Sequence, residues 1–330
     1  LVAAQTNLAQ VLYRLGDGAA AVDEVAVALQ QVDALPDSPE KVEQDAYVRV
    51  TVGQILRDSG DVVNTESAFE TADELCETLV QFRPEHSPYR VLHGEVKNNV
   101  GVHYLLNNDP EKAHLAFTSA LTDFDKALEL NKGDVAASHG RAWCLNYLAD
   151  TLYELSRKDE AAKLYREAIK SRAALCRADP NSVEYQYAHA WLLLTCQDRS
   201  FRDALEGSRI AARLSRSTPE NGRLLVLHAL GQLRSEDYFG VIKSLDTAVK
   251  YRLSNKTPAD FIRAMALWIN EDKDGAESAW KIANSTMRGY APGDFKLRRL
   301  QAETAKLMGK EIPTPEATEG GSEPATETGN

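Results

Sequence analysis

The sequence predicts an all-α protein, an α-solenoid of about seven antiparallel helix pairs followed by a C-terminal capping helix. Three observations support this fold class. Small residues recur at long intervals, each is followed about twelve residues later by an alanine that starts a second helical stretch, and turn-forming residues separate the two stretches. Repetition of this kind is the sequence signature of a solenoid, in which each repeat packs only on its neighbours.

The predicted pairs share a set of positions: a small or apolar residue on the first helix, then alanine, a large residue and alanine on one face of the second. The second to fourth units show the pattern best. The first four units place there Ala9, Leu12, Ala21, Val25 and Ala28; Gly53, Leu56, Thr65, Phe69 and Ala72; Gly101, Tyr104, Ala113, Phe117 and Ala120; and Ala149, Leu152, Ala161, Tyr165 and Ala168. Weaker units follow, with Leu192, Ala204, Ser208 and Ala211; Ala229, Val241, Leu245 and Ala248; and Ala264, Leu267, Ala276, Trp280 and Ala283.

Close packing of two antiparallel helices explains this spacing. A small residue such as Gly101 lets the second helix approach, and the large residue, here Phe117, fills the wedge toward the next pair. Turn formers lie between the helices at 16–17, 60–61 and 107–110. Asn and Gly tolerate the left-handed conformation that ends a helix, and Pro110 suits the first turn of the next one.

These positions resemble the tetratricopeptide repeat (TPR), whose pattern is Leu-Gly, an aromatic, then Ala, an aromatic and Ala, and finally Pro. The resemblance covers residues 2–290, and it implies a TPR-like superhelical array over 1–290. The TPR period is about 34 residues, but the small positions from Ala9 to Leu192 differ by 44, 48, 48 and 43 residues. We expect longer helices rather than longer links, because the apolar pattern continues past the final alanine of each unit.

Lengthened units of this kind resemble the TPR arrays of kinesin light chains and those appended to bacterial serine/threonine protein kinases. The resemblance to the kinase-appended arrays rests on three short motifs: Asn98-Asn99-Val100-Gly101, Pro88-Tyr89-Arg90 and Asp179-Pro180-Asn181. The resemblance implies a bacterial protein.

The C-terminal residues divide into two parts. Residues 291–309 contain the apolar positions Phe295, Leu297, Leu300, Ala305 and Leu307 with charges between them, and they predict a helix that covers the last apolar face. Residues 310–330 are acidic and rich in Pro, Gly and Thr, and they predict a disordered tail.

Charge and cysteine content restrict the partners and the compartment. The net charge is −11, which disfavours a nucleic-acid or anionic-membrane surface, because these require a basic face. No run of apolar residues is long enough to span a membrane. The four cysteines lack a C-x-x-C spacing and fall in apolar helical stretches, so we expect free thiols in a reducing compartment, the cytoplasm.

The sequence contains none of the catalytic motifs that we sought. Phosphate-binding glycine loops, H-E-x-x-H, G-x-S-x-G and the kinase phrases H-R-D and D-F-G are missing from its 330 residues. The seven histidines are scattered. We therefore expect a non-enzyme with no catalytic residues, no cofactor and no metal site.

The candidate binding residues follow from the resemblance, which implies that the first helix of each pair lines a concave groove. Amide side chains there suit an extended peptide, because they donate to and accept from its backbone, and Tyr or Trp adds apolar contact. An alternative stays open, in which some of these amides tie adjacent helices together. The peptide-binding candidates are Asn7, Gln10, Gln54, Arg57, Asn98, Asn99, Trp143, Asn146, Asp150, Tyr153 and His189, with Thr6, Tyr13, Tyr47, Glu95 and Gln186 on the same faces.

One kind of partner is disfavoured. TPR domains that clamp the C-terminal carboxylate of chaperones share a Lys/Asn/Lys/Arg set in the groove. The matching positions here are Thr6, Gln10, Thr51, Glu95 and Asn99. Without cations, these positions cannot neutralise a carboxylate.

The predicted function is a non-catalytic scaffold that binds a peptide or protein segment in the concave groove; self-association stays open. The alternative is the sensory or docking region of a larger serine/threonine protein kinase, with its catalytic domain upstream of residue 1. The chain opens at Leu1 without Met, so we expect a fragment or a processed product.

Overall fold

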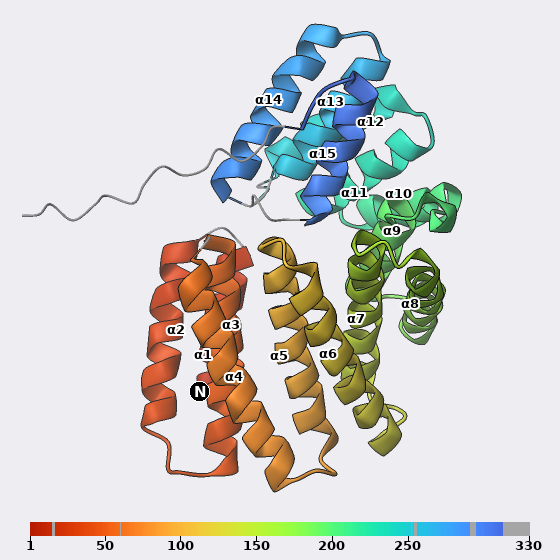
Figure 1. Ribbon diagram of the computed structural model, residues 1–330. Coiled ribbons are helices and arrows are strands. Elements are labelled where there is room, and N and C mark those ends of the chain that lie inside the picture. The colour runs from red at the N-terminus through yellow and green to blue at the C-terminus, as the bar shows by residue number, and fades with distance from the viewer. Residues whose placement is uncertain (15–16, 60, 252, 254–255, 291–294, 313–330) are drawn as a thin grey trace, which may run out of the picture.

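The protein is a continuous array of stacked helix pairs (Figure 1). The computed structural model describes residues 1–14, 17–59, 61–251, 253, 256–290 and 295–312. Within these ranges the chain forms fifteen α-helices, one short 3₁₀ helix (Arg199–Phe201) and no β-strand. The all-α solenoid of seven helix pairs followed by a single C-terminal helix is therefore confirmed.

The first helices of the pairs carry odd labels up to α13, and the second helices carry even labels. The first helices are α1 (Val2–Arg14), α3 (Pro39–Ser59), α5 (Ser87–Leu106), α7 (Val135–Glu154), α9 (Val183–Thr195), α11 (Gly222–Arg234) and α13 (Thr257–Ile269). The second helices are α2 (Gly18–Asp33), α4 (Val62–Phe82), α6 (Pro110–Leu130), α8 (Lys158–Ala178), α10 (Ala204–Ser217), α12 (Tyr238–Lys250) and α14 (Lys273–Tyr290), and α15 (Phe295–Met308) ends the array.

Longer helices account for the unusual period, as the sequence predicted. The six helices from α3 to α8 have 20 or 21 residues each, whereas the links at 83–86 and 131–134 are short. From α9 to α13 the helices shorten to 13 or 14 residues. The longest helices therefore lie in the second to fourth pairs, and Figure 1 shows α3 to α7 side by side.

The glycines of the second and third pairs mark the closest approach of their two helices. A Cβ atom at Gly101 would lie 2.6 Å from Cε1 of Phe117, and one at Gly53 would lie 2.4 Å from the same atom of Phe69. In the fifth pair the close approach is on the other helix, because a Cβ at Gly207 would lie 2.8 Å from Leu194. Ala204, the small residue expected there, is only partly buried.

The turns inside the third, sixth and seventh pairs combine a left-handed residue with an aspartate cap. Asn108 has φ 61°, and the next residue, Asp109, accepts a hydrogen bond from the backbone N–H of Lys112 at 3.0 Å. Pro110 follows as the first residue of α6. A side-chain cap of this kind stabilises a helix by about 1 kcal/mol. Ser156, Glu236 and Glu271 also have positive φ values at the corresponding turns.

The last helix, α15, packs mainly on α13 and buries Leu297, Leu300, Ala305 and Met308 against the last two pairs. Its charged side chains reach farther back along the array, as described below. Of the predicted tail, residues 310–330, the structure describes 310–312, where Lys310 forms an ion pair with Glu277 at 2.6 Å; residues 313–330 lie outside the described residues. None of the described helices is both long and apolar enough to cross a membrane.

Candidate functional site

The first helices form a layer of their own, which we call the inner layer. α1 packs on α3, α3 on α5, and α5 on α7, and the series resumes with α9 on α11 and α11 on α13. In the described part of the chain, α7 and α9 do not pack closely on each other, so the inner layer is interrupted there. Two cavities open on this layer, one before the interruption and one at it.

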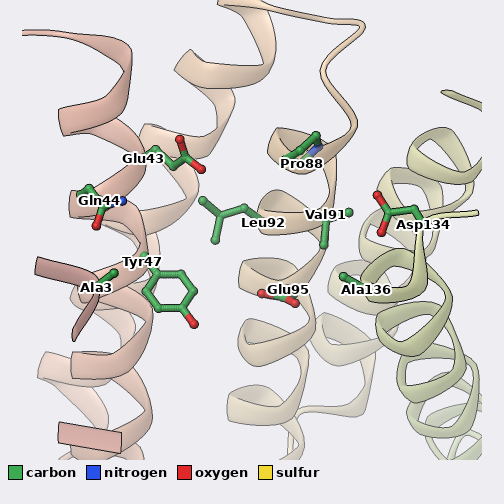
Figure 2. Close-up of a pocket in the computed structure, with 10 residues that line it drawn as sticks. All are labelled: Ala3, Glu43, Gln44, Tyr47, Pro88, Val91, Leu92, Glu95, Asp134 and Ala136. Atoms are coloured by element: carbon green, nitrogen blue, oxygen red, sulfur yellow. The ribbon is translucent and has the colours of Figure 1, made fainter. Parts of the chain in front are cut away.

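The first opening, which we call the N-terminal cavity, has a volume of about 400 Å³ (Figure 2). Figure 2 shows the Tyr47 ring of α3 and the Leu92 and Glu95 side chains of α5 between these two helices, with Asp134 and Ala136 at the start of α7 beyond them. Ten residues line it: Ala3, Glu43, Gln44, Tyr47, Pro88, Val91, Leu92, Glu95, Asp134 and Ala136.

The polar lining of the N-terminal cavity is acidic. Glu43, Glu95 and Asp134 contribute carboxylates, and the lining contains no Lys or Arg. Asp134 is already engaged, since it accepts hydrogen bonds from Ser87 Oγ at 2.8 Å and from the backbone N–H of Ala137. Glu95 differs: burial raises the pKa of its carboxyl to about 7, and its carboxyl has no hydrogen bond among the described residues.

The candidate amides of the first three pairs mostly join neighbouring helices. Gln10 of α1 donates to Thr51 Oγ1 of α3 at 3.0 Å. Gln54 and Arg57 of α3 both donate to Asn99 Oδ1 of α5, at 3.1 and 3.3 Å. The structure therefore brings these three together as a bridge between α3 and α5, the alternative that the sequence left open.

Two other candidates of this region, Asn7 and Asn98, do not form such hydrogen bonds between helices among the described residues. Asn7 is exposed on α1. Asn98 lies one turn after Glu95 on α5, and its Oδ1 atom is buried without a hydrogen-bond partner in the described part of the chain. Amide groups of this kind can still accept from a bound backbone.

Two candidates of the fourth pair, Asn146 and Asp150, belong to a network that includes the C-terminal helix. Asp150 accepts hydrogen bonds from Tyr165 Oη at 2.6 Å and from Asn146 Nδ2 at 3.2 Å. Arg299 of α15 forms an ion pair with the same carboxylate at 2.7 Å, and the Asp150 side chain is 2% exposed. Asp150 and Asn146 therefore belong to a buried network that attaches α15 to α7.

Further contacts of α15 extend along the inner layer. Glu303 pairs with Arg202, which follows α9, and with Arg234 of α11, each at 2.5 Å. Arg298 donates to Asn108 Oδ1, at the end of α5, at 2.9 Å. The predicted capping helix therefore also contacts residues in α11 and residues that follow α5 and α9.

The second cavity, of about 170 Å³, lies where α7 and α9 separate, and α15 forms one of its walls. The candidate Trp143 lines it, while Tyr153 lies half-buried under Lys158 farther along α7. His189 is buried nearby, and its pKa is lowered, first by burial and then by the charge of Arg172. Ten residues line this cavity: Trp143, Asn146, Arg172, Tyr187, Ala188, Trp191, Leu192, Arg223, Pro258 and Leu297.

Arg172 is the functional candidate that the sequence analysis missed. It continues the buried stripe of α8, four residues after Ala168, at the place that Phe124 holds in α6. An arginine in a stripe of alanines and aromatics was therefore visible in the sequence.

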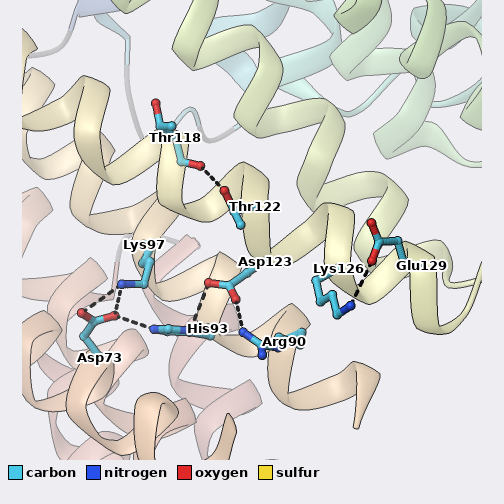
Figure 3. Close-up of polar contacts among 9 residues, drawn as sticks. All are labelled: Asp73, Arg90, His93, Lys97, Thr118, Thr122, Asp123, Lys126 and Glu129. Carbon is cyan, nitrogen blue, oxygen red and sulfur yellow. Dashed lines mark hydrogen bonds and ion pairs between the residues drawn. The ribbon is translucent and has the colours of Figure 1, made fainter. Parts of the chain in front are cut away.

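An ion network joins α4, α5 and α6 on the other side of the third pair (Figure 3). His93 lies between two carboxylates, with Nε2 at 3.1 Å from Asp73 and Nδ1 at 3.0 Å from Asp123. Lys97 and Arg90 complete it at 3.4 and 3.0 Å. His93 and Asp73, together with Glu77, have ligand atoms close enough for a metal ion. Because Lys97 already pairs with Asp73, and His93 has both ring nitrogens against carboxylates, we interpret the cluster as a structural network.

Comparisons with known proteins agree with the repeat architecture. The sequence profile described as tetratricopeptide repeat matches residues 141–180, which cover most of α7 and all of α8. No curated protein sequence matches the chain.

Solved structures resemble the chain in fold at low sequence identity. The apo form of RapI is 14% identical, with 87% of this chain and 98% of that chain covered and a TM-score of 0.52. A tetratricopeptide repeat protein from Parabacteroides merdae is 16% identical, with 92% and 98% covered and a TM-score of 0.48. The Rap conjugation gene regulator of the plasmid pLS20, solved with the Phr* peptide, is 11% identical, with 93% and 95% covered and a TM-score of 0.46. The chain therefore contains one segment, residues 141–180, that matches a tetratricopeptide repeat, and it shares with RapI a fold of stacked helix pairs.

Proposed function

We propose that the chain is a non-catalytic scaffold that holds a segment of a partner protein or peptide on its inner layer, with a basic side chain of that segment in the N-terminal cavity. The observation that carries the proposal is the Glu95 carboxyl. It lies beside an open cavity of about 400 Å³ and has no hydrogen bond among the described residues.

Charge supports a basic ligand. The raised pKa of Glu95 has burial as its cause, so an incoming ammonium or guanidinium group would favour the ionised carboxylate. Glu43 on α3 adds a second carboxylate to the same lining. The Tyr47 and Leu92 side chains offer apolar surface to the stem of a lysine or arginine, which commonly packs along such surface.

Asn98 supports an extended ligand backbone. Its buried Oδ1 lacks a hydrogen-bond partner among the described residues, one helical turn from Glu95. A peptide N–H placed there would satisfy this oxygen, and such a bond contributes about 0.5–1.5 kcal/mol. The amides that bridge α1, α3 and α5 would then hold the layer in place rather than contact the ligand.

Selection from a random peptide display library tests the proposal. The folded chain should enrich peptides that carry Lys or Arg, and the double variant Glu43→Gln/Glu95→Gln should lose at least tenfold in affinity for them. Tyr47→Ala should also weaken binding, because it removes the apolar wall.

Glu40→Gln is the matched control, since Glu40 is an exposed carboxylate on the same helix and does not line the cavity. It should bind like the parent. Enrichment of peptides without a basic residue, or equal loss in the control and the double variant, would contradict the proposal.

A further inference from the structure

Arg172 is a buried cation without an anionic partner. It is 3% exposed, its Nε is buried with no hydrogen-bond partner, and its guanidinium forms no ion pair within the described ranges. Burial lowers its pKa to about 10, so the group still carries its charge at neutral pH. An unpaired buried charge is costly to a fold, which makes its place in the second cavity unusual.

The nearby acidic groups are engaged elsewhere. Asp150 is held by Arg299, Tyr165 and Asn146. Glu184 lies 3.5 Å from Arg223, and its side chain is half-exposed. The positive charge of Arg172 is therefore not neutralised by a direct contact from within the protein.

The neighbouring histidines add no charge that would compete for an anion. Burial lowers the pKa values of both His139 and His189, and the charge of Arg172 lowers them further. Both imidazoles are consequently neutral at pH 7.

Aromatic rings line the cavity beside the guanidinium and define the apolar part of the site. Arg172 lies over the Trp143 ring at 4.8 Å from its centroid, and Arg223 lies over the Tyr187 ring at 3.7 Å. Trp191 completes the lining and stacks on Tyr187. A planar guanidinium presents two N–H groups to a carboxylate in parallel, and the rings suit a flat or aliphatic group attached to it.

We propose that the second cavity is a binding site for a carboxylate that is attached to an apolar or aromatic group, with Arg172 as its principal contact and Arg223 as the second. A free organic acid and a peptide carboxylate share this chemistry. The site is separate from the N-terminal cavity and does not depend on the function proposed there.

Titration of small probes into the full chain tests the site. The probe 3-phenylpropionate should bind, perturb tryptophan fluorescence and raise the unfolding temperature, whereas its neutral amide, 3-phenylpropionamide, should bind at least tenfold more weakly. Two peptides distinguish the sources: one with a free C-terminal Phe carboxylate, and one with a capped C-terminus and an internal Glu-Phe pair. Tighter binding of the first peptide would identify a C-terminal carboxylate as the ligand group, and tighter binding of the second would identify a Glu side chain. If 3-phenylpropionate binds and neither peptide does, the ligand is a free organic acid.

Arg172→Met is the decisive variant. It should lose at least tenfold in affinity for 3-phenylpropionate, yet it should unfold at the same or a higher temperature, because an apolar side chain replaces an unpaired buried charge. Arg172→Lys, which keeps the charge but lacks the planar fork, should bind more weakly than the parent and remain folded. Arg177→Met, an exposed arginine on the same helix, should bind like the parent.

Three outcomes would overturn the proposal. These are equal binding of the acid and its amide, undiminished binding of the acid by Arg172→Met, and no binding of any carboxylate probe by the parent.

Discussion

The ion pair between Asp150 and Arg299 should be a main attachment of α15 to the rest of the array. The two side chains are 2% and 14% exposed and lie 2.7 Å apart. Arg299→Met would leave the Asp150 carboxylate buried, with only the Tyr165 hydroxyl and the Asn146 amide as donors. Removal of one partner from a buried ion pair costs about 3–5 kcal/mol, because the remaining charge is uncompensated.

Urea unfolding followed by circular dichroism measures this cost. Asp150→Asn should destabilise the protein comparably, and the double variant should cost less than the sum of the two. We expect an interaction energy of about 0.5–3 kcal/mol from this double-mutant cycle. Native-state hydrogen exchange should show faster exchange in α15 in both single variants.

Arg209→Met is the control for the loss of an arginine. Arg209 pairs with Glu206 on the surface of α10, where the two side chains are 62% and 37% exposed, so its loss should hardly change the urea midpoint. The reasoning is refuted if Arg299→Met costs no more than this control, or if the two single changes in the cycle are additive.

The remaining predictions concern packing, pH and thiol chemistry. Gly101→Leu should lower the unfolding temperature, at a cost of about 1–3 kcal/mol or more, because even a Cβ there would lie 2.6 Å from Phe117; an unchanged temperature would contradict the packing. Burial alone would lower the pKa of His93, but hydrogen bonds with Asp123 and Asp73 raise it above its ordinary value of 6.5. The stability advantage of the parent over His93→Gln should therefore be fully present below pH 6.5 and lost as the pH rises through the raised pKa, as measured in urea between about pH 6 and pH 9. Cys176 is half-buried and the three other cysteines are buried, so a thiol reagent should modify Cys176 first in the native protein, and Cys176→Ala should remove this fast phase.

The pairing of helices could be predicted because it depends on local positions. Gly101, Ala113 and Phe117 lie within one pair, and their spacing is fixed by helix geometry and a short turn. The fifth pair was harder, since Leu194 occupies the first helix and Gly207 supplies the small residue on the second. The two helices of this pair still approach closely, but the small residue that permits it lies on the second helix. The repeat pattern therefore predicted Ala204 instead of Gly207.

The position of α15 could not be predicted from the same pattern. Its apolar residues predicted a helix that covers the last apolar face, and the pattern assigned no partners to the charges between them. Arg299 and Glu303 instead reach residues far earlier in the chain, in contacts that depend on how the array bends between α7 and α9. For this reason, the repeat pattern did not predict the contacts that Asn146 and Asp150 make within the protein.

The two cavities carry opposite charge, and this has a consequence for any ligand long enough to reach both. The N-terminal cavity presents Glu43 and Glu95, whereas the second cavity presents Arg172 and Arg223. If both proposals hold, a segment with a basic residue at one end and a carboxylate at the other would bind in one direction only, because reversal would place like charges together. A peptide selected on the N-terminal cavity should then bind more tightly when a carboxylate is added on one side of its basic residue but not on the other. Arg172→Met should abolish that gain while leaving the affinity of the unextended peptide unchanged.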